Sequence, residues 1–335
     1  MAGKNTRDVT IYYKRLDGAW DGVTLENAVR QAMDVAADTG KIKDLWRHRQ
    51  RLDPKDARLS YFINHHQDDS QLLFGDLVSF TAGRSQHLLA NLGDVAEVDV
   101  ETMSAPEKKE YLDSMMFWML VGNNVLLIQS ASLRADALEH YLNWLLKERT
   151  QAITNDNSVI LVDQFALVSS KGKDLPDIRE INIGGRVVAG DIQPRTSHEA
   201  SPVVRDVGEI ASSDDRNWIA RVLGAVLGDD QKVNNTLKKV PDGTKLKVSV
   251  RLGYERTKLD ADREALRDIL VAVRNLPDSD LSAKTASGTI TGDKIRLTYG
   301  AKIETVGDLL DQNATKAAMI EAYNHFLKSG QLPSN

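Results

Sequence analysis

Cysteine is missing from this chain of 335 residues, and several classes of chemistry are missing with it. Disulfide bonds, thiol catalysis, iron–sulfur clusters and zinc sites built from cysteine are all excluded. Proline is scarce, with eight residues, and no long low-complexity tract occurs, so we do not expect extensive disorder. A chain without cysteine fits a reducing compartment, and we expect the protein to be cytoplasmic.

The sequence also lacks a long uninterrupted apolar run. Its densest apolar segment spans 114–146 and begins SMMFWMLVGNNVLLIQS. A membrane-spanning helix needs about 20 predominantly apolar residues, whereas this run is broken by Gly122-Asn123-Asn124 and becomes polar toward its end. The N-terminal sequence carries charges but no apolar core, so we do not expect a secretory signal. Segment 114–146 is therefore expected to lie in a protein core.

Common catalytic motifs are absent too. The chain contains no GxxxxGK[ST] or GxGxxG nucleotide-binding loop, no GxSxG elbow, no HExxH and no kinase signature set. The single cluster that suggests a metal is His65-His66 with Asp68-Asp69. Adjacent histidines on a strand point to opposite faces, so we favour a polar loop after the strand 59–64. We expect no catalytic residue, no metal and no cofactor.

Positive charge, in contrast, is gathered into two segments, although the net charge of −5 argues weakly against non-specific nucleic-acid binding. In the first segment, KIKDLWRHRQRLDPKDAR, the flat rings of Trp46 and His48 are interleaved with cations and are suited to stacking on bases or sugars. The alternative is a solvated polar segment. The candidate DNA contacts here are Lys43, Arg47, Arg49 and Arg51.

The second segment, KLKVSVRLGYERTK, has the alternation of an amphipathic strand. On such a strand Lys245, Lys247 and Arg251 share one face, with cations about 7 Å apart, which suits the phosphate spacing of a nucleic acid. An ordinary amphipathic strand with a solvated face is the alternative. Further candidate contacts are the neighbouring cations Arg256 and Lys258, and Lys238 and Lys239 upstream.

The first part of the chain predicts an α+β domain over 1–193, with a largely antiparallel sheet packed with helices. Apolar runs 115–121 and 125–129 flank the turn signal Gly122-Asn123-Asn124 and predict a buried hairpin, followed by a helix from Ser132. The other predicted elements are a helix over 24–39 that stops at Gly40, strands over 59–65, 71–80, 96–101 and 158–167, and two strands within 178–192 that meet at Gly184-Gly185.

A second, smaller α+β domain is predicted over 214–335, after a serine-rich linker at 194–213 with two prolines. Its predicted elements are a helix from 213, a strand over 245–254, a helix over 260–276, strands over 288–292 and 294–300, and a closing helix over 315–328.

This layout resembles the RexA-type phage-exclusion proteins of lambda-type temperate phages over most of the chain. The resemblance is carried by MMFWMLVGNNVLLIQSASLRADALEHYLNWLL, KLKVSVRLGYERTKLDADREALRDILVAV, SAKTASGTITGDKIRLTYG and TKAAMIEAYNHFLKSG. The first segment alone is also similar to the recombination-associated DNA-binding protein RdgC. The resemblance implies a dimeric, non-enzymatic DNA-binding protein that works with a small membrane protein. RexA-type proteins look basic, whereas this chain is mildly acidic, which favours a role that depends on a partner.

Three hypotheses follow. The first is a DNA-binding homodimer of a phage-defence or superinfection-exclusion system that grips the DNA backbone and signals to a small integral membrane protein, with no small-molecule substrate. The second is a metal-dependent nuclease-type effector, for which His66, Asp68 and Asp69 are the candidate ligands. The third is an adaptor whose exposed apolar surface binds another protein without contacting DNA. We favour the first.

Overall fold

Two compact units make up the structure, a computed structural model of mixed α+β fold in which antiparallel sheets dominate, as the sequence predicts. Unit 1 combines residues 1–161 with 299–328, and unit 2 combines 162–298 with 329–335. The structure describes residues 5–18, 20, 22–89, 100–163, 178–188, 245–253, 281–285, 288–292 and 296–332. The predicted linker at 194–213 lies outside these residues, so the sequence-based domain boundaries stay a prediction.

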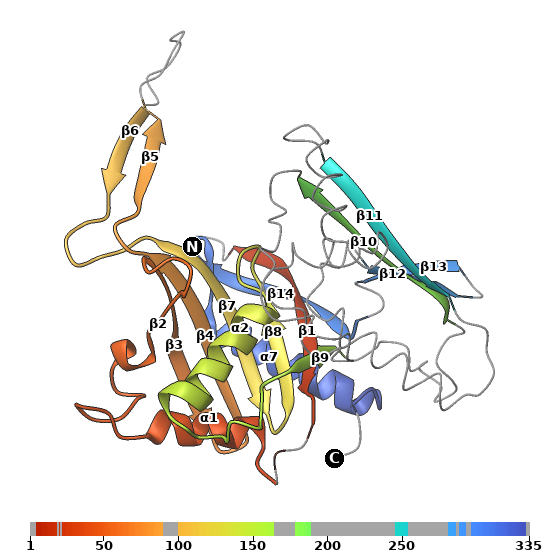
Figure 1. The fold of residues 1–335 in the computed structure, drawn as a ribbon, viewed down its shortest axis with the longest axis horizontal. Helices are drawn as coiled ribbons and strands as arrows, with labels where there is room; N and C mark the ends of the chain where they lie inside the picture. The colour runs from red at the N-terminus through yellow and green to blue at the C-terminus, as the bar shows by residue number, and fades with distance from the viewer. Residues whose placement is uncertain are drawn as a thin grey trace, which may run out of the picture. The chain divides into compact units, whose positions relative to one another are not determined.

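The centre of unit 1 is a sheet with the strand order β15-β14-β1-β8-β7-β4-β3-β2 (Figure 1), and β9, which starts at the last residue of segment 1–161, pairs with β1. A separate two-stranded ribbon is formed by β5 and β6. The strands are β1 (Thr6–Leu16), β2 (Arg51–Leu52), β3 (Leu59–Asp69), β4 (Leu72–Thr81), β5 (Ser85–Leu89), β6 (Val100–Ser104), β7 (Leu112–Val121), β8 (Asn124–Ile128), β9 (Leu161–Asp163), β14 (Thr298–Val306) and β15 (Leu309–Leu310).

The predicted hairpin is confirmed as β7 and β8, which turn at Gly122 and Asn123. Gly122 has a φ of +59°, a backbone conformation that glycine adopts without strain. The turn also holds the start of α1 (Leu25–Asp34): the Asn123 Oδ1 accepts from the Leu25 N–H at 2.8 Å, and the Gly122 N–H donates to the Glu26 carboxylate at 2.5 Å. The hairpin is thus tied to the helix that covers it.

Helix α1 is shorter than predicted. Thr24 caps it by accepting from the Asn27 N–H at 3.2 Å, but the helix ends at Asp34 and not at Gly40. Val35 is extended, and its carbonyl accepts from the Ile42 N–H at 2.9 Å. This backbone pairing replaces the last helical turns, and Gly40, at φ +79°, serves the loop instead.

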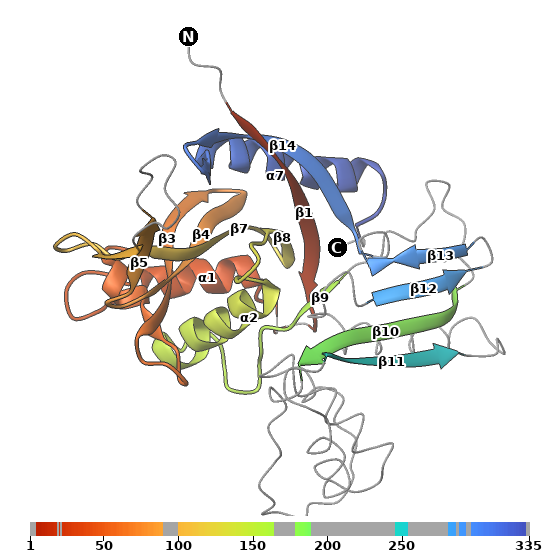
Figure 2. The same cartoon turned by 90° about the horizontal axis from the view of Figure 1, so that it is seen from above.

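Helices cover both faces of the central sheet (Figure 2). On one face, α1 and α2 (Ala135–Asn143) form a core with alternate residues of the strands, including Leu77, Trp118 and Leu127. The segment after α2 continues as a π-helix, η2 (Trp144–Arg149). A short 3₁₀ helix, η1 (Trp46–Arg49), precedes β2.

The opposite face is covered by α7 (Gln312–Lys328), the predicted closing helix, which begins three residues earlier than expected. Phe326 of α7 packs edge-on against Tyr13 of β1, with ring centroids 5.8 Å apart. The predicted strand 294–300 is displaced, because β14 starts at Thr298 and runs to Val306. β1 itself was not predicted.

Unit 2 contains a four-stranded antiparallel sheet in the order β11-β10-β12-β13. Its strands are β10 (Ile178–Val188), β11 (Lys245–Gly253), β12 (Leu281–Thr285) and β13 (Gly288–Thr291). The prediction of two strands meeting at Gly184-Gly185 is wrong: β10 runs through both glycines, which pair with Ser249 and Val248 of β11. The predicted helices from 213 and over 260–276 lie outside the described residues.

Among the described residues, no helix is long and apolar enough to cross a membrane.

Candidate nucleic-acid interface

Trp46 is held on the surface of unit 1 by two aromatic side chains from the sheet. Its indole is 39% exposed, and its ring centroid lies 5.1 Å from that of Phe62 and 6.3 Å from that of Phe80. Phe62 and Phe80 come from β3 and β4 and contact each other edge-on at 6.1 Å. Trp46 is therefore supported from beneath, which leaves part of a large flat ring available for stacking.

Arg47 lies against this indole, with its guanidinium carbon 5.5 Å from the centroid of the Trp46 ring. This is the geometry of a cation–π contact. Arg47 is exposed, and among the described residues it has no carboxylate partner. A flat ring with an adjacent cation can stack on an unpaired base and contact its phosphate. We call Trp46, Arg47, Phe62 and Phe80 the aromatic surface.

The apolar border of the aromatic surface comes from neighbouring strands. Leu52 of β2, which is 54% exposed, pairs with Ser60, and Leu112 of β7, which is 43% exposed, pairs with Phe80. Leu45, directly before η1, is 45% exposed. These leucines add exposed apolar area beside the aromatic side chains.

Arg49 has a different place from the one predicted, because its side chain is buried, with 5% exposed. Its Nε donates to the Ile63 carbonyl at 2.8 Å, and its Nη atoms donate to the carbonyls of Ile42, Lys43 and Asn64. Burial lowers the pKa of this guanidinium. Arg49 thus ties the loop before η1 to β3, and its guanidinium is not available for contact with DNA.

The remaining cations of the first basic segment do not form one patch. Lys43 forms an ion pair with Asp34 at 2.7 Å, and Lys41 pairs with the same carboxylate at 3.1 Å, which lowers the pKa of Asp34. Arg51 of β2 is half-buried and pairs in register with Tyr61.

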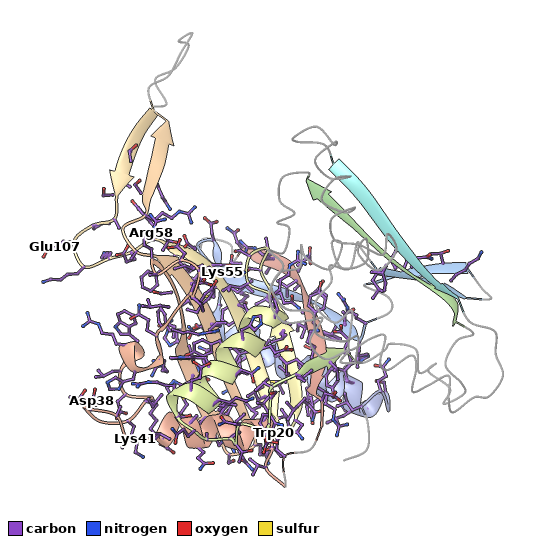
Figure 3. All side chains as sticks on the ribbon, in the orientation of Figure 1. Trp20, Asp38, Lys41, Lys55, Arg58 and Glu107 are labelled. Carbon is purple, nitrogen blue, oxygen red and sulfur yellow. The ribbon has the colours of Figure 1, made fainter. Side chains whose placement is uncertain are left out.

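Figure 3 places Lys55 and Arg58 near one end of unit 1 and Lys41 near the other. His48, predicted to offer a second flat ring, is half-buried, and its Nδ1 lies 3.3 Å from the Lys41 carbonyl.

The second basic segment forms the predicted strand. In β11, Lys245, Lys247 and Arg251 occupy alternate positions opposite Val188, Arg186 and Asn182 of β10. The structure describes the backbone of β11 but not its side chains. Lys238, Lys239, Arg256 and Lys258 lie outside the described residues.

The histidine–aspartate cluster is part of a strand and not of a loop, because β3 continues to Asp69. Asp68 pairs with Arg30 at 2.8 Å and Asp69 with Lys316 at 2.6 Å, so both carboxylates already have cation partners. His66 is half-buried, and burial lowers its pKa. Within the part of the chain that the structure describes, no group of three His, Asp or Glu side chains is arranged to hold a metal ion.

Sequence reasoning identified Trp46 and Arg47 but missed the two residues that support them. Phe62 and Phe80 lie in LSYFINH and QLLFGDLVSF, where they look like ordinary core residues. Their shared face follows from the β3–β4 register, in which Ser60 pairs with Phe80 and Phe62 with Val78, and that register is not readable from either segment alone.

No protein-family model matches the chain, and no curated protein matches its sequence.

Proposed function

We propose that the protein is a non-enzymatic, cytoplasmic DNA-binding protein of a phage-exclusion system, acting as a homodimer that signals to a small integral membrane protein. The observation that carries DNA binding is the aromatic surface: an indole 39% exposed, supported by two phenylalanines and flanked by an arginine. The exclusion role, the dimer and the membrane partner follow the resemblance to RexA-type proteins.

In this proposal Trp46 stacks on an unpaired base and Arg47 contacts the adjoining phosphate. Stacking of a base on an aromatic side chain contributes about 1–3 kcal/mol and is tolerant of sequence. The cations of β11 in unit 2 supply further phosphate contacts, with Lys245, Lys247 and Arg251 at alternate positions of the strand. Because the chain is acidic overall, we expect few phosphate contacts and a moderate dependence of affinity on salt.

Binding of a fluorescently labelled single-stranded oligonucleotide, measured by anisotropy over a salt series, tests the proposal. Trp46→Ala is expected to weaken binding by about 5-fold to 100-fold, whereas Trp46→Phe keeps a stacking ring and most of the affinity. The control is Lys302→Ala, which removes an exposed cation on β14. Absence of binding at low salt, or equal affinity of the Trp46→Ala variant, would refute the proposal.

The contribution of β11 is tested separately. The double variant Lys245→Glu/Lys247→Glu is expected to weaken binding and to lower the slope of log affinity against log salt by about two, since each lost phosphate contact removes about 0.9. An unchanged slope in a folded variant would exclude these lysines as phosphate contacts. It would leave the role of Trp46 to be judged from its own variants.

An adaptor function is the second candidate, and the exposed Leu45, Leu52 and Leu112 favour it, because contiguous exposed apolar side chains mark protein interfaces. The two functions differ in what Arg47→Ala does. Loss of salt-sensitive DNA binding in that variant supports the first function. A wild-type protein that binds no DNA, but whose partner binding is lost in Leu52→Ser, supports the adaptor.

A further inference from the structure

A pocket of about 550 Å³ lies in unit 1, between the loop before α1 and the segment that follows η2. Its volume falls within the range of about 300–1,000 Å³ that is usual for small-molecule sites. Figure 3 shows Trp20, one of its lining residues, at the opposite end of unit 1 from Lys55 and Arg58. The described lining residues are Trp20, Val23, Lys147, Gln151, Ala152, Ile153, Thr154, Asn155 and Asn157.

The walls of the pocket carry one full charge, the ammonium of Lys147. Its Nζ donates to the Asn155 carbonyl at 3.1 Å and to the Ser158 hydroxyl at 2.7 Å, which fixes the side chain and leaves the third of its three N–H donors for a ligand. No carboxylate occurs among the described lining residues. The electrostatics of the pocket therefore favour an anionic group.

Three amide side chains, from Gln151, Asn155 and Asn157, also line the pocket. Among the described residues, none of these side chains has a hydrogen-bond partner within the protein. Each amide offers donors and an acceptor, so together they can recognise a polar ring edge or sugar hydroxyls. Trp20, which is 4% exposed, and Val23 supply an apolar wall that suits a flat heterocycle.

The segment that forms the pocket departs from regular structure at two places. Lys147 lies in the π-helix η2, a conformation that occurs frequently at functional sites. Gln151, just after this helix, has a φ of +54°, which is uncommon for any residue other than glycine. The conformation is held in place, because Thr150 donates through both its N–H and its hydroxyl to the Leu145 carbonyl. The walls are thus formed before any ligand binds.

The fixed ammonium, the three unpartnered amides and the apolar indole wall are the groups that a nucleotide requires. We propose that this pocket is a binding site for a mononucleotide, with Lys147 contacting the phosphate and the amides of Gln151, Asn155 and Asn157 contacting the sugar and the edge of the base. The site is separate from the aromatic surface and does not depend on the protein binding DNA.

Calorimetric titration of the full chain tests the proposal with four probes: AMP, adenosine, ribose 5-phosphate and inorganic phosphate. AMP is expected to bind more tightly than any of its fragments, since only AMP reaches both the ammonium and the amides. Lys147→Met is expected to weaken AMP about tenfold or more and to leave adenosine unchanged, because one charge-assisted hydrogen bond is lost. GMP, CMP and UMP in place of AMP then show which base is preferred.

Gln151 offers a variant in which misfolding cannot explain a loss of binding. Gln151→Gly removes one amide and relieves the backbone at φ +54°, so the protein is expected to stay folded while AMP binds several-fold more weakly. Gln151→Asn keeps an amide on a residue that tolerates this backbone, and it is expected to recover part of the affinity. Trp46→Ala, at the aromatic surface, is expected to bind AMP as the wild type does.

Two results would overturn the proposal. One is that none of the four nucleotides binds with a dissociation constant below about 1 mM, the range expected for a small polar ligand in a formed site. The other is that AMP binds but its affinity is the same in the Lys147→Met and Gln151→Gly variants, which would place the nucleotide elsewhere on the molecule.

Discussion

Gly75 lies in the middle of β4 at a position where a methyl group has no room. A Cβ atom added there would lie 2.5 Å from the His65 carbonyl oxygen and 2.5 Å from the Trp118 Cζ2 atom. We expect Gly75→Ala to lower the free energy of unfolding by about 1–3 kcal/mol through overpacking, measured by urea denaturation. Gly300→Ala in β14 is the matched control, because a Cβ atom added at Gly300 would meet nothing within 4 Å. Equal stabilities of the two variants would contradict the prediction.

Asp76, the next residue, is a fully buried carboxylate on the face covered by α7. Its Oδ1 accepts from the His65 N–H at 3.0 Å, and its Oδ2 lies 3.4 Å from the Gln312 Nε2 of α7. Burial raises the pKa of this carboxyl above its usual range. The folded protein therefore holds the Asp76 proton more tightly than the unfolded chain does.

The sign of the pH dependence follows from this pKa shift. An aspartate that is protonated more readily in the folded state costs stability as pH rises from about 3.9, the pKa of an unfolded aspartate, through the raised pKa of the folded state. Asp76→Asn lacks this titration but keeps an oxygen for the His65 N–H. We expect the variant to gain stability relative to wild type between pH 4 and neutral pH, in urea denaturation at several pH values. A difference that stays constant with pH would contradict this.

At the scale of single elements, the turn between β7 and β8 stabilises α1 as well as its own hairpin. Asn123→Ala removes the acceptor of the Leu25 N–H, and we expect it to lower the free energy of unfolding by about 1 kcal/mol, as for the loss of a helix cap. Thr24→Ala, which removes the local cap of the same helix, provides the comparison. If only the Thr24 variant is destabilised, the contact from the turn contributes nothing measurable.

Helix α7 contributes through one of two adjacent residues. Phe326 is 1% exposed and packs against Tyr13, whereas Leu327 is 50% exposed. We expect Phe326→Ala to lower the free energy of unfolding by about 3–5 kcal/mol and Leu327→Ala to change it by less than about 0.5 kcal/mol. Thermal or urea unfolding of the two variants checks the contrast, and similar losses in both would show that α7 packs in another orientation.

Local pattern predicted those elements whose signals are complete within a few residues. The hairpin at Gly122-Asn123, the strand β11 and the closing helix all carry such signals. The early end of α1 and the continuity of β10 through Gly184-Gly185 depend on backbone partners elsewhere, Ile42 in the first case and β11 in the second. The same holds for the aromatic surface, since Trp46 was visible in the sequence but its support depends on the β3–β4 register.

At the scale of the whole molecule, unit 1 is discontinuous in sequence, and no local pattern indicates this. β14 and α7 come from the end of the chain, yet β14 lies beside β1 in the sheet and α7 covers one of its faces. The sequence suggested two consecutive domains because composition changes near 194–213, whereas contacts between the β1 and β14 regions join residues about 300 positions apart, such as Arg7 with the Asp308 carbonyl. Such pairing cannot be read from one sequence.

The discontinuity makes a prediction about fragments of the chain. Residues 1–161 alone lack the strand beside β1 and the helix that buries Tyr13 and Phe74, so they expose a large apolar face of the sheet. We expect this fragment to aggregate. A single chain that joins 1–161 to 299–328 through a flexible linker of Gly and Ser restores both elements, and we expect it to be monodisperse or dimeric and to unfold cooperatively in urea. The same fusion with Phe326→Ala should lose that cooperativity, because the helix then lacks its main apolar contact. If 1–161 folds cooperatively by itself, α7 is an accessory to the sheet and not part of its core.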